Sequence, residues 1–68
     1  MDIKLLVGKR VRELRNSIGI SQEELADLAD LDRTYITSVE CGKRNISIVN
    51  IEKLASALQV SLKEFFSF

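Results

Sequence analysis

The stretch Ser21–Glu40, SQEELADLADLDRTYITSVE, contains two short amphipathic segments separated by a few polar residues. Ser21 and Glu24 form an S-x-x-E capping box, which predicts that a helix begins here and runs to about Ala29. Asp32 is a good N-cap for a following helix, so only two or three residues join the two. A connection this short between two helices is typical of a helix-turn-helix.

Helical periodicity continues on both sides of this unit. Before it, apolar residues recur every three or four positions and predict a helix over 3–18 that ends at Gly19; they are Ile3, Val7, Val11, Leu14 and Ile18. Within it, the apolar positions are Leu25, Ala26, Leu28 and Ala29 in the first helix and Ile36 and Val39 in the second, which stops at Gly42. After it, Ser47 caps a fourth helix with an apolar stripe of Ile48, Ile51, Leu54, Ala55 and Leu58. A second S-x-x-E box, Ser61 to Glu64, opens a short fifth helix through Phe66.

These elements predict an all-α fold of five helices in a single domain over residues 1–68. No segment alternates with a period of two residues, so we expect no sheet. A chain of 68 residues builds only one small core. It has one Cys and no His, which excludes an internal disulfide and a His/Cys metal site, and we expect no metal or cofactor. Stability must then come from helix packing, from pairing with a second copy, or from both.

The composition bounds the class of function. The net charge is zero, but basic residues gather near the start and again at Lys43 and Arg44, with acidic residues between them, so one face can still be basic. No apolar run reaches the roughly 18 residues of a membrane span, and the start lacks a signal-peptide core, so we expect a cytoplasmic protein without membrane contact. Without His, a nucleophile–base pair or a phosphate-binding glycine loop, the chain does not read as an enzyme.

The stretch 21–40, together with Gly42-Lys43 after it, resembles the XRE-type, lambda-repressor-like helix-turn-helix family. The resemblance covers nearly the whole chain, from Lys9 to Leu58. Within the family, Leu31-Asp-Arg-Thr-Tyr-Ile36 followed by Gly42-Lys-Arg-Asn45 is similar to the controller proteins of restriction–modification systems, which are homodimeric five-helix regulators of about this size. The resemblance implies a lambda-repressor-like domain with its helix-turn-helix at helices 2 and 3.

The resemblance also implies a set of DNA-binding residues. Gln22, at the start of the second helix, matches a position that contacts phosphate. The third helix enters the major groove, and its matching positions are Arg33, Thr34, Thr37 and Ser38, with Tyr35 beside them. The loop residues that match a grip on the flanking backbone are Lys43, Arg44 and Asn45.

Physical chemistry agrees with a base-reading role for the third helix. Arg33, near its N-terminus, can donate two hydrogen bonds to guanine, and the methyl group of Thr34 or Thr37 can contact thymine. Simpler interpretations remain open for several residues. Arg33 can be a solvated arginine, Tyr35 a packing residue, and Lys43 and Arg44 ordinary loop residues.

The basic cluster from Lys9 to Arg15 is interpreted mainly as a solvated helix face, with phosphate binding as the alternative. For Arg15, the resemblance implies a more specific role, an ion pair with Glu40 that ties the first helix to the third. Cys41 is interpreted as incidental rather than as a redox switch, because only Lys43 and Arg44 nearby would lower its pKa.

Two positions depart from the family pattern in a way that affects the backbone. Asp30 and Gln59 stand where glycine is common, so Asp30 must adopt an unusual backbone angle, which Asp tolerates better than most residues. Its charge near phosphates is also expected to weaken DNA affinity.

The apolar residues near the C-terminus exceed what a small core can bury and predict a homodimer interface; they are Val49, Leu62, Phe65, Phe66 and Phe68. The predicted function is therefore a transcriptional regulator that binds a two-fold symmetric operator in double-stranded DNA as a homodimer. The alternative is a phage-type repressor, or an antitoxin whose main role is to bind a partner. Glu23, Glu24 and Asp27 offer a contact for RNA polymerase, but we favour a solvated face that the helix dipole stabilises.

Overall fold

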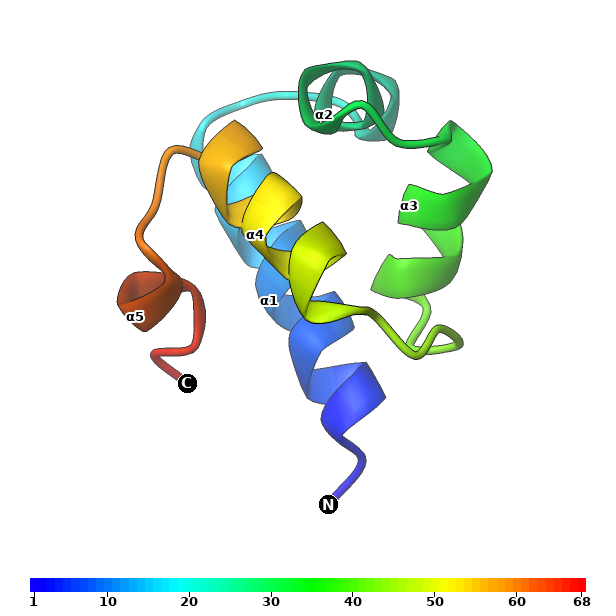
Figure 1. Ribbon diagram of the computed structural model, residues 1–68, viewed down its shortest axis with the longest axis vertical. Helices are drawn as coiled ribbons and strands as arrows, with labels where there is room; N and C mark the ends of the chain where they lie inside the picture. The colour runs from blue at the N-terminus through cyan, green and yellow to red at the C-terminus, as the bar shows by residue number, and fades with distance from the viewer.

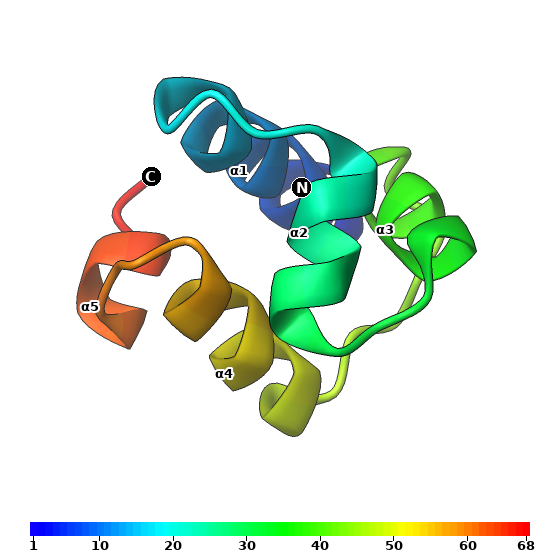
Figure 2. The same ribbon diagram turned by 90° about the horizontal axis from the view of Figure 1, so that it is seen from above.

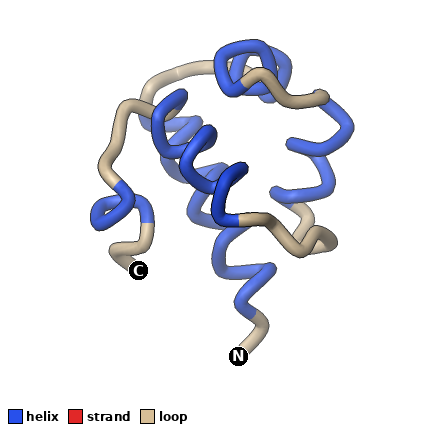
Figure 3. The backbone as a smooth tube through the Cα atoms, in the orientation of Figure 1, coloured by secondary structure: helices blue, strands red, loops and turns tan.

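The computed structural model describes residues 1–68 as five helices without strands (Figure 1, Figure 3). Their bounds are α1 Ile3–Ser17, α2 Gln22–Ala29, α3 Arg33–Glu40, α4 Ile48–Ala57 and α5 Leu62–Phe65. The predicted all-α, five-helix class is thus confirmed, with α2 and α3 joined by three residues. None of the five helices is long and apolar enough to cross a membrane.

Side-chain caps start every helix. Ser21 and Glu24 form the full capping box at α2, and Asp32 accepts from the backbone N–H of Thr34 at α3. At α5 only half of the predicted box is present, because Ser61 accepts from Glu64 N–H without the reciprocal bond. The cap of α1 is Asp2, which the sequence reasoning did not identify.

Four helices end in the same way. A residue with positive φ stands one position after α2 and two positions after α1, α3 and α4, and the next backbone N–H donates to the carbonyl five residues earlier. The positive-φ residues are Gly19, Asp30, Gly42 and Gln59, with φ of 72°, 56°, 74° and 63°. The corresponding bonds are Ile20 to Arg15, Leu31 to Ala26, Lys43 to Ser38 and Val60 to Ala55. Asp30 and Gln59 therefore do adopt the left-handed backbone conformation that glycine usually supplies.

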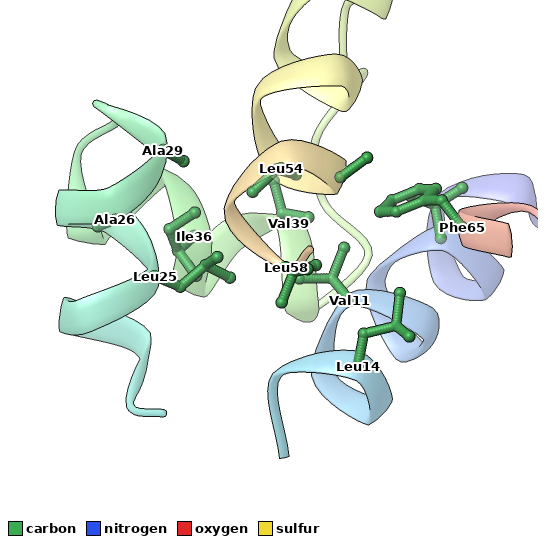
Figure 4. Packing of buried hydrophobic residues seen from close by; sticks show 12 residues of the cluster. Val11, Leu14, Leu25, Ala26, Ala29, Ile36, Val39, Leu54, Leu58 and Phe65 are labelled. Carbon is green, nitrogen blue, oxygen red and sulfur yellow. The ribbon is translucent and has the colours of Figure 1, made fainter. Parts of the chain in front are cut away.

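One cluster of buried apolar side chains draws on all five helices. In Figure 4 it extends from Ala26, Ala29, Leu25 and Ile36 on the α2–α3 side to Phe65 at the other end. Figures 1 and 2 show the same arrangement, with α3 and α5 on opposite sides of the molecule.

The α1–α3 contact is close because Gly8 has no side chain. A Cβ at this position would collide with the backbone carbonyl of Val39. This close approach brings the middle of α1 against the C-terminal end of α3 and places the side chains that follow Gly8 on α1 near Glu40.

The predicted apolar stripes were too wide at their ends. The sequence places Ile3, Ile18, Leu28 and Ile48 on the core side, but these residues are 55%, 40%, 62% and 82% exposed. Ile3 and Ile48 open their helices and Ile18 follows the last turn of α1, so no neighbouring helix covers them. Leu28 lies on α2 beside the buried Ala29 but on its outer side.

Candidate nucleic-acid interface

The two faces of α3 differ sharply in chemistry. Ile36, Val39 and Glu40 are buried against the rest of the protein. Because residues three or four apart share a helix face, the opposite face carries the exposed Arg33, Thr34 and Thr37, with Ser38 half-buried at its edge. The predicted base-facing residues therefore lie together on one polar surface that runs from the first residue of the helix to its sixth.

Glu40 is the polar centre beneath this surface. Its side chain is fully buried and receives hydrogen bonds from Arg15 Nε (2.7 Å) and Nη2 (3.0 Å). Arg12 Nε approaches the same carboxylate at 3.3 Å from a side chain that is 55% exposed. Arg15 also donates to the carbonyl of Ile20. The ion pair between Arg15 and Glu40 thus ties α1 to α3, and it also anchors the loop between α1 and α2.

This environment keeps Glu40 charged. Burial raises the pKa of Glu40, but hydrogen bonds from Arg15 and Gln22, the charge of Arg15 and a hydrogen bond from Arg12 lower it by more. The net pKa of Glu40 lies below its ordinary value of 4.5. The hydrogen bond to Glu40 outweighs desolvation at Arg15 and raises the pKa of Arg15. Both partners are therefore ionised at neutral pH.

Gln22 connects this pair to the exposed face of α3. Its Nε2 donates to Glu40 (3.1 Å), and its Oε1 accepts from the hydroxyl of Thr37 (3.0 Å). The side chain is half-buried, and the second hydrogen on Nε2 remains available for a phosphate. The position predicted to contact the DNA backbone is therefore also a structural link between α2 and α3.

Tyr35 connects α3 to both the loop and α4. Its hydroxyl accepts from Asn50 Nδ2 (3.1 Å), and its ring packs against the core. The guanidinium of Arg44 lies 5.0 Å from the centre of the Tyr35 ring, within the range of a cation–π contact. Lys43, Arg44 and Asn45 are all exposed in the loop after α3.

The residues predicted to form the dimer interface do not behave alike. Val49, Leu62, Phe66 and Phe68 are 59%, 46%, 45% and 55% exposed. Phe65, by contrast, is completely buried, so its assignment to a dimer surface is wrong. It fills the end of the core between α1 and α4, which leaves nothing of its ring for a second chain to contact.

The sequence did not reveal three side chains that hold the interface in place, two on α1 and one on α4. Arg10 donates from Nε to the carbonyl of Phe65 (3.1 Å) and from Nη2 to that of Glu64 (2.6 Å), and so holds α5. Arg12 joins the Glu40 carboxylate, and Asn50 holds Tyr35. Three of the clustered basic side chains, Arg10, Arg12 and Arg15, are therefore bonded within the protein, whereas Lys9 is exposed. A polar residue in the apolar first turn of α4 was an available sign of the role of Asn50.

A short turn between two helices, with a polar face on the second and basic residues after it, defines a helix-turn-helix DNA-binding fold. The helix-turn-helix family model matches residues 11–65, and the chain belongs to this family.

Within that family, the chain belongs with the restriction–modification controller proteins. Control protein C.MunI from a Mycoplasma species is 48% identical over 67 residues, which cover 97% of this chain and 90% of that protein. The crystal structure of the controller protein C.AhdI from Aeromonas hydrophila has a TM-score of 0.90 at 52% identity and covers 93% of this chain and 91% of its own. The controller C.Esp1396I, crystallised as a tetramer with its natural 35-base-pair operator, has a TM-score of 0.91 at 35% identity. That match covers 97% of this chain and 87% of C.Esp1396I.

Proposed function

We propose that this protein regulates transcription by binding a specific, two-fold symmetric DNA operator as a homodimer, in the manner of a restriction–modification controller. The observation that carries the proposal is the exposed polar face of α3, with Arg33, Thr34 and Thr37 on a helix whose other side is buried. Such a helix fits the major groove, where these side chains meet base edges. The relatives named above support the assignment, and C.Esp1396I was crystallised on its operator.

In this proposal one group of residues contacts the bases and another contacts the phosphates. Arg33, Thr34, Thr37 and Ser38 face the bases, with Tyr35 positioned beside them. Gln22 and the loop residues Lys43, Arg44 and Asn45 contact phosphates on either side. Arg44 starts from a defined position over the Tyr35 ring, which reduces the entropy that it would lose on binding.

The acidic residues of α2 have a smaller part in the proposal. Glu24 is committed to the capping box, and Glu23 lies in the same first turn, where a negative charge stabilises the positive end of the helix dipole. We assign these residues to the stability of α2. A contact with RNA polymerase is the alternative for Glu23 and Asp27, which are both exposed. We assign the protein no catalytic activity.

The homodimer rests on the exposed apolar residues that remain after the correction for Phe65. Val49, Leu62, Phe66 and Phe68 are each about half exposed, and Phe66 also lines a groove together with Ile3 and Ile51. A two-fold dimer buries the same patch on both chains and spaces the two α3 helices about 34 Å apart, one turn of DNA. Sedimentation at micromolar concentration should show a dimer. A monomer that does not pair even on DNA would contradict this part of the proposal.

The experiment on DNA binding compares two arginines with different roles. If Arg33 pairs with guanine, Arg33→Ala should cost about 1–3 kcal/mol of binding free energy and relax the preference at one base pair per half-site. Arg44→Ala should weaken binding to all sequences and lower the salt dependence by about one unit per lost contact in each subunit. Titrations of operator and scrambled DNA at several salt concentrations measure both effects. Equal weakening of both DNAs by Arg33→Ala would mean that Arg33 contacts phosphate and that α3 has been placed wrongly.

A further inference from the structure

The direction of the hydrogen bonds around Glu40 determines how Gln22 is oriented. An ionised carboxylate only accepts hydrogen bonds, and Glu40 takes them from Arg12, Arg15 and Gln22. Gln22 must therefore turn its NH2 group toward Glu40. The opposite orientation would place two oxygens, Gln22 Oε1 and Glu40 Oε1, at the 3.1 Å now spanned by a hydrogen bond.

The orientation of Gln22 in turn fixes the hydroxyl of Thr37. Thr37 Oγ1 lies 3.0 Å from Gln22 Oε1 and 3.2 Å from the backbone carbonyl of Arg33. Both neighbours are acceptors, and a hydroxyl has a single hydrogen. Whichever of the two receives it, that hydrogen points into the protein. Thr37 is nevertheless exposed, so its hydroxyl presents only lone pairs to whatever approaches the outer face of α3.

We propose that Thr37 acts toward DNA only as a hydrogen-bond acceptor. It accepts a hydrogen bond from the exocyclic amino group of adenine or cytosine, and it disfavours guanine or thymine, whose O6 or O4 is also an acceptor. In the major groove, adenine N6 and cytosine N4 carry hydrogens, whereas guanine O6 and thymine O4 do not. A lone pair that faces a carbonyl oxygen leaves both groups without a partner. This inference rests on the proposed function and adds to it the chemical type of one base per half-site.

Thr34 provides a matched contrast on the same face. Its backbone N–H donates to Asp32, but its hydroxyl makes no hydrogen bond within the protein. That hydroxyl is free to rotate, and it can donate to a carbonyl as readily as it accepts from an amino group. The two threonines are therefore expected to differ in selectivity although their side chains are identical.

The test begins with selection of binding sites from a library of randomised DNA duplexes by the wild-type protein and by Thr37→Val. The base pair at which Thr37→Val loses preference is the one that residue 37 reads. It should present adenine or cytosine to that residue. In a second step, that base is replaced by its analogue without the amino group, purine for adenine or 2-pyrimidinone for cytosine.

The wild type should bind the analogue duplex about tenfold more weakly than the natural one. Thr37→Val should bind both duplexes equally, at about the level of wild type on the analogue. Thr37→Ser, which keeps the hydroxyl, should still discriminate between them. The matched Thr34→Val variant should discriminate between the natural and the analogue duplex by the same factor as the wild type, because residue 37 is unchanged. Circular dichroism checks that each variant is folded, and the wild-type and Thr37→Ser titrations do not depend on the fold of Thr37→Val.

Several outcomes would overturn the inference. They are a selected base that presents a carbonyl to residue 37, wild-type binding that is insensitive to the analogue, and no base pair at which the Thr37→Val preference changes. Each of these leaves the protein a sequence-specific DNA binder and removes only the role of Thr37. Failure of the wild type to enrich any sequence would instead overturn the proposed function, and this inference with it.

Discussion

The α1–α3 contact is organised around a buried carboxylate, whereas α5 is attached by a buried phenyl ring. Glu40 has three side-chain partners, from α1 and α2, and each bond has a fixed direction. Phe65 fills apolar volume and has no directional requirement of its own. A hydrogen-bonded network is satisfied in few arrangements, while apolar packing tolerates small shifts. We infer that the molecule places directional bonds where the position of α3 matters for reading DNA, and nondirectional packing where α5 only has to close the core.

The largest expected effect tests the apolar end of this comparison. Phe65→Ala removes a completely buried ring and should cost about 3–5 kcal/mol in the free energy of unfolding. For a small domain that is a large part of the total stability. Urea unfolding followed by circular dichroism measures it. The control is Phe68→Ala, at a terminal residue that is 55% exposed, and an equally large loss there would contradict the distinction between these two rings.

The next effect tests the polar end. Glu40→Gln removes the buried charge and leaves Arg15, whose side chain is only 13% exposed, without its counterion. The free energy of unfolding should fall by about 3 kcal/mol, at the low end for a broken buried pair because Arg15 keeps some contact with water. Arg12→Ala is the control and should cost at most about 1 kcal/mol, since this partner is largely exposed. Thermal unfolding of Glu40→Gln that matches the wild type would show that the pair does not stabilise the fold.

The same carboxylate should make stability depend on pH. The pKa of Glu40 is lower in the folded protein than its ordinary value of 4.5, so the unfolded chain takes up the proton first as the pH falls. The stabilisation of the fold by the charged Glu40 is complete above pH 4.5 and is lost as the pH falls through the pKa of Glu40 in the folded protein. The free energy of unfolding then changes by at most about 1.4 kcal/mol per pH unit. The measurement is therefore the difference between wild type and Glu40→Gln, which should shrink on acidification. A constant difference would mean that Glu40 titrates normally.

The sequence predicted much of the fold because its caps and periodicity act locally. Ser21, Asp32, Ser47 and Ser61 each cap the helix that was expected to follow them. The exposed polar face of α3 also followed from the three-residue spacing of Ile36 and Val39.

Apart from the pair of Arg15 and Glu40, which the family resemblance implied, the sequence could not supply the partner of each side chain. Phe65, Phe66 and Phe68 lie at the end of a single helical turn, which is too short for periodicity to show that only Phe65 faces inward. The bonds of Arg10 to α5 span more than fifty residues of sequence, and no local pattern indicates them. The orientation of Gln22 depends on Glu40, 18 residues away.

The smallest expected effect asks whether the two sides of the molecule open independently. Arg10 donates to the carbonyls of Phe65 and Glu64, and these bonds are the one directional element at the apolar end. Arg10→Ala should cost about 1 kcal/mol in the free energy of unfolding, because water partly replaces its bonds to groups near the surface. Lys9→Ala, at an exposed neighbour on α1, should change stability by less than about 0.5 kcal/mol.

Hydrogen exchange of backbone amides gives the more decisive measurement for Arg10→Ala. If α5 is held mainly by Phe65 and Arg10, its amides should exchange faster in the variant, through local opening that leaves the rest folded. The amides of α3 should keep their wild-type protection, because the Glu40 network that holds this helix contains no part of α5. Equal acceleration in α3 and α5 would mean that the core opens as one unit. In that case the carboxylate and the phenyl ring would stabilise the same cooperative structure, and the position of α3 on DNA would depend on the packing of α5 as well.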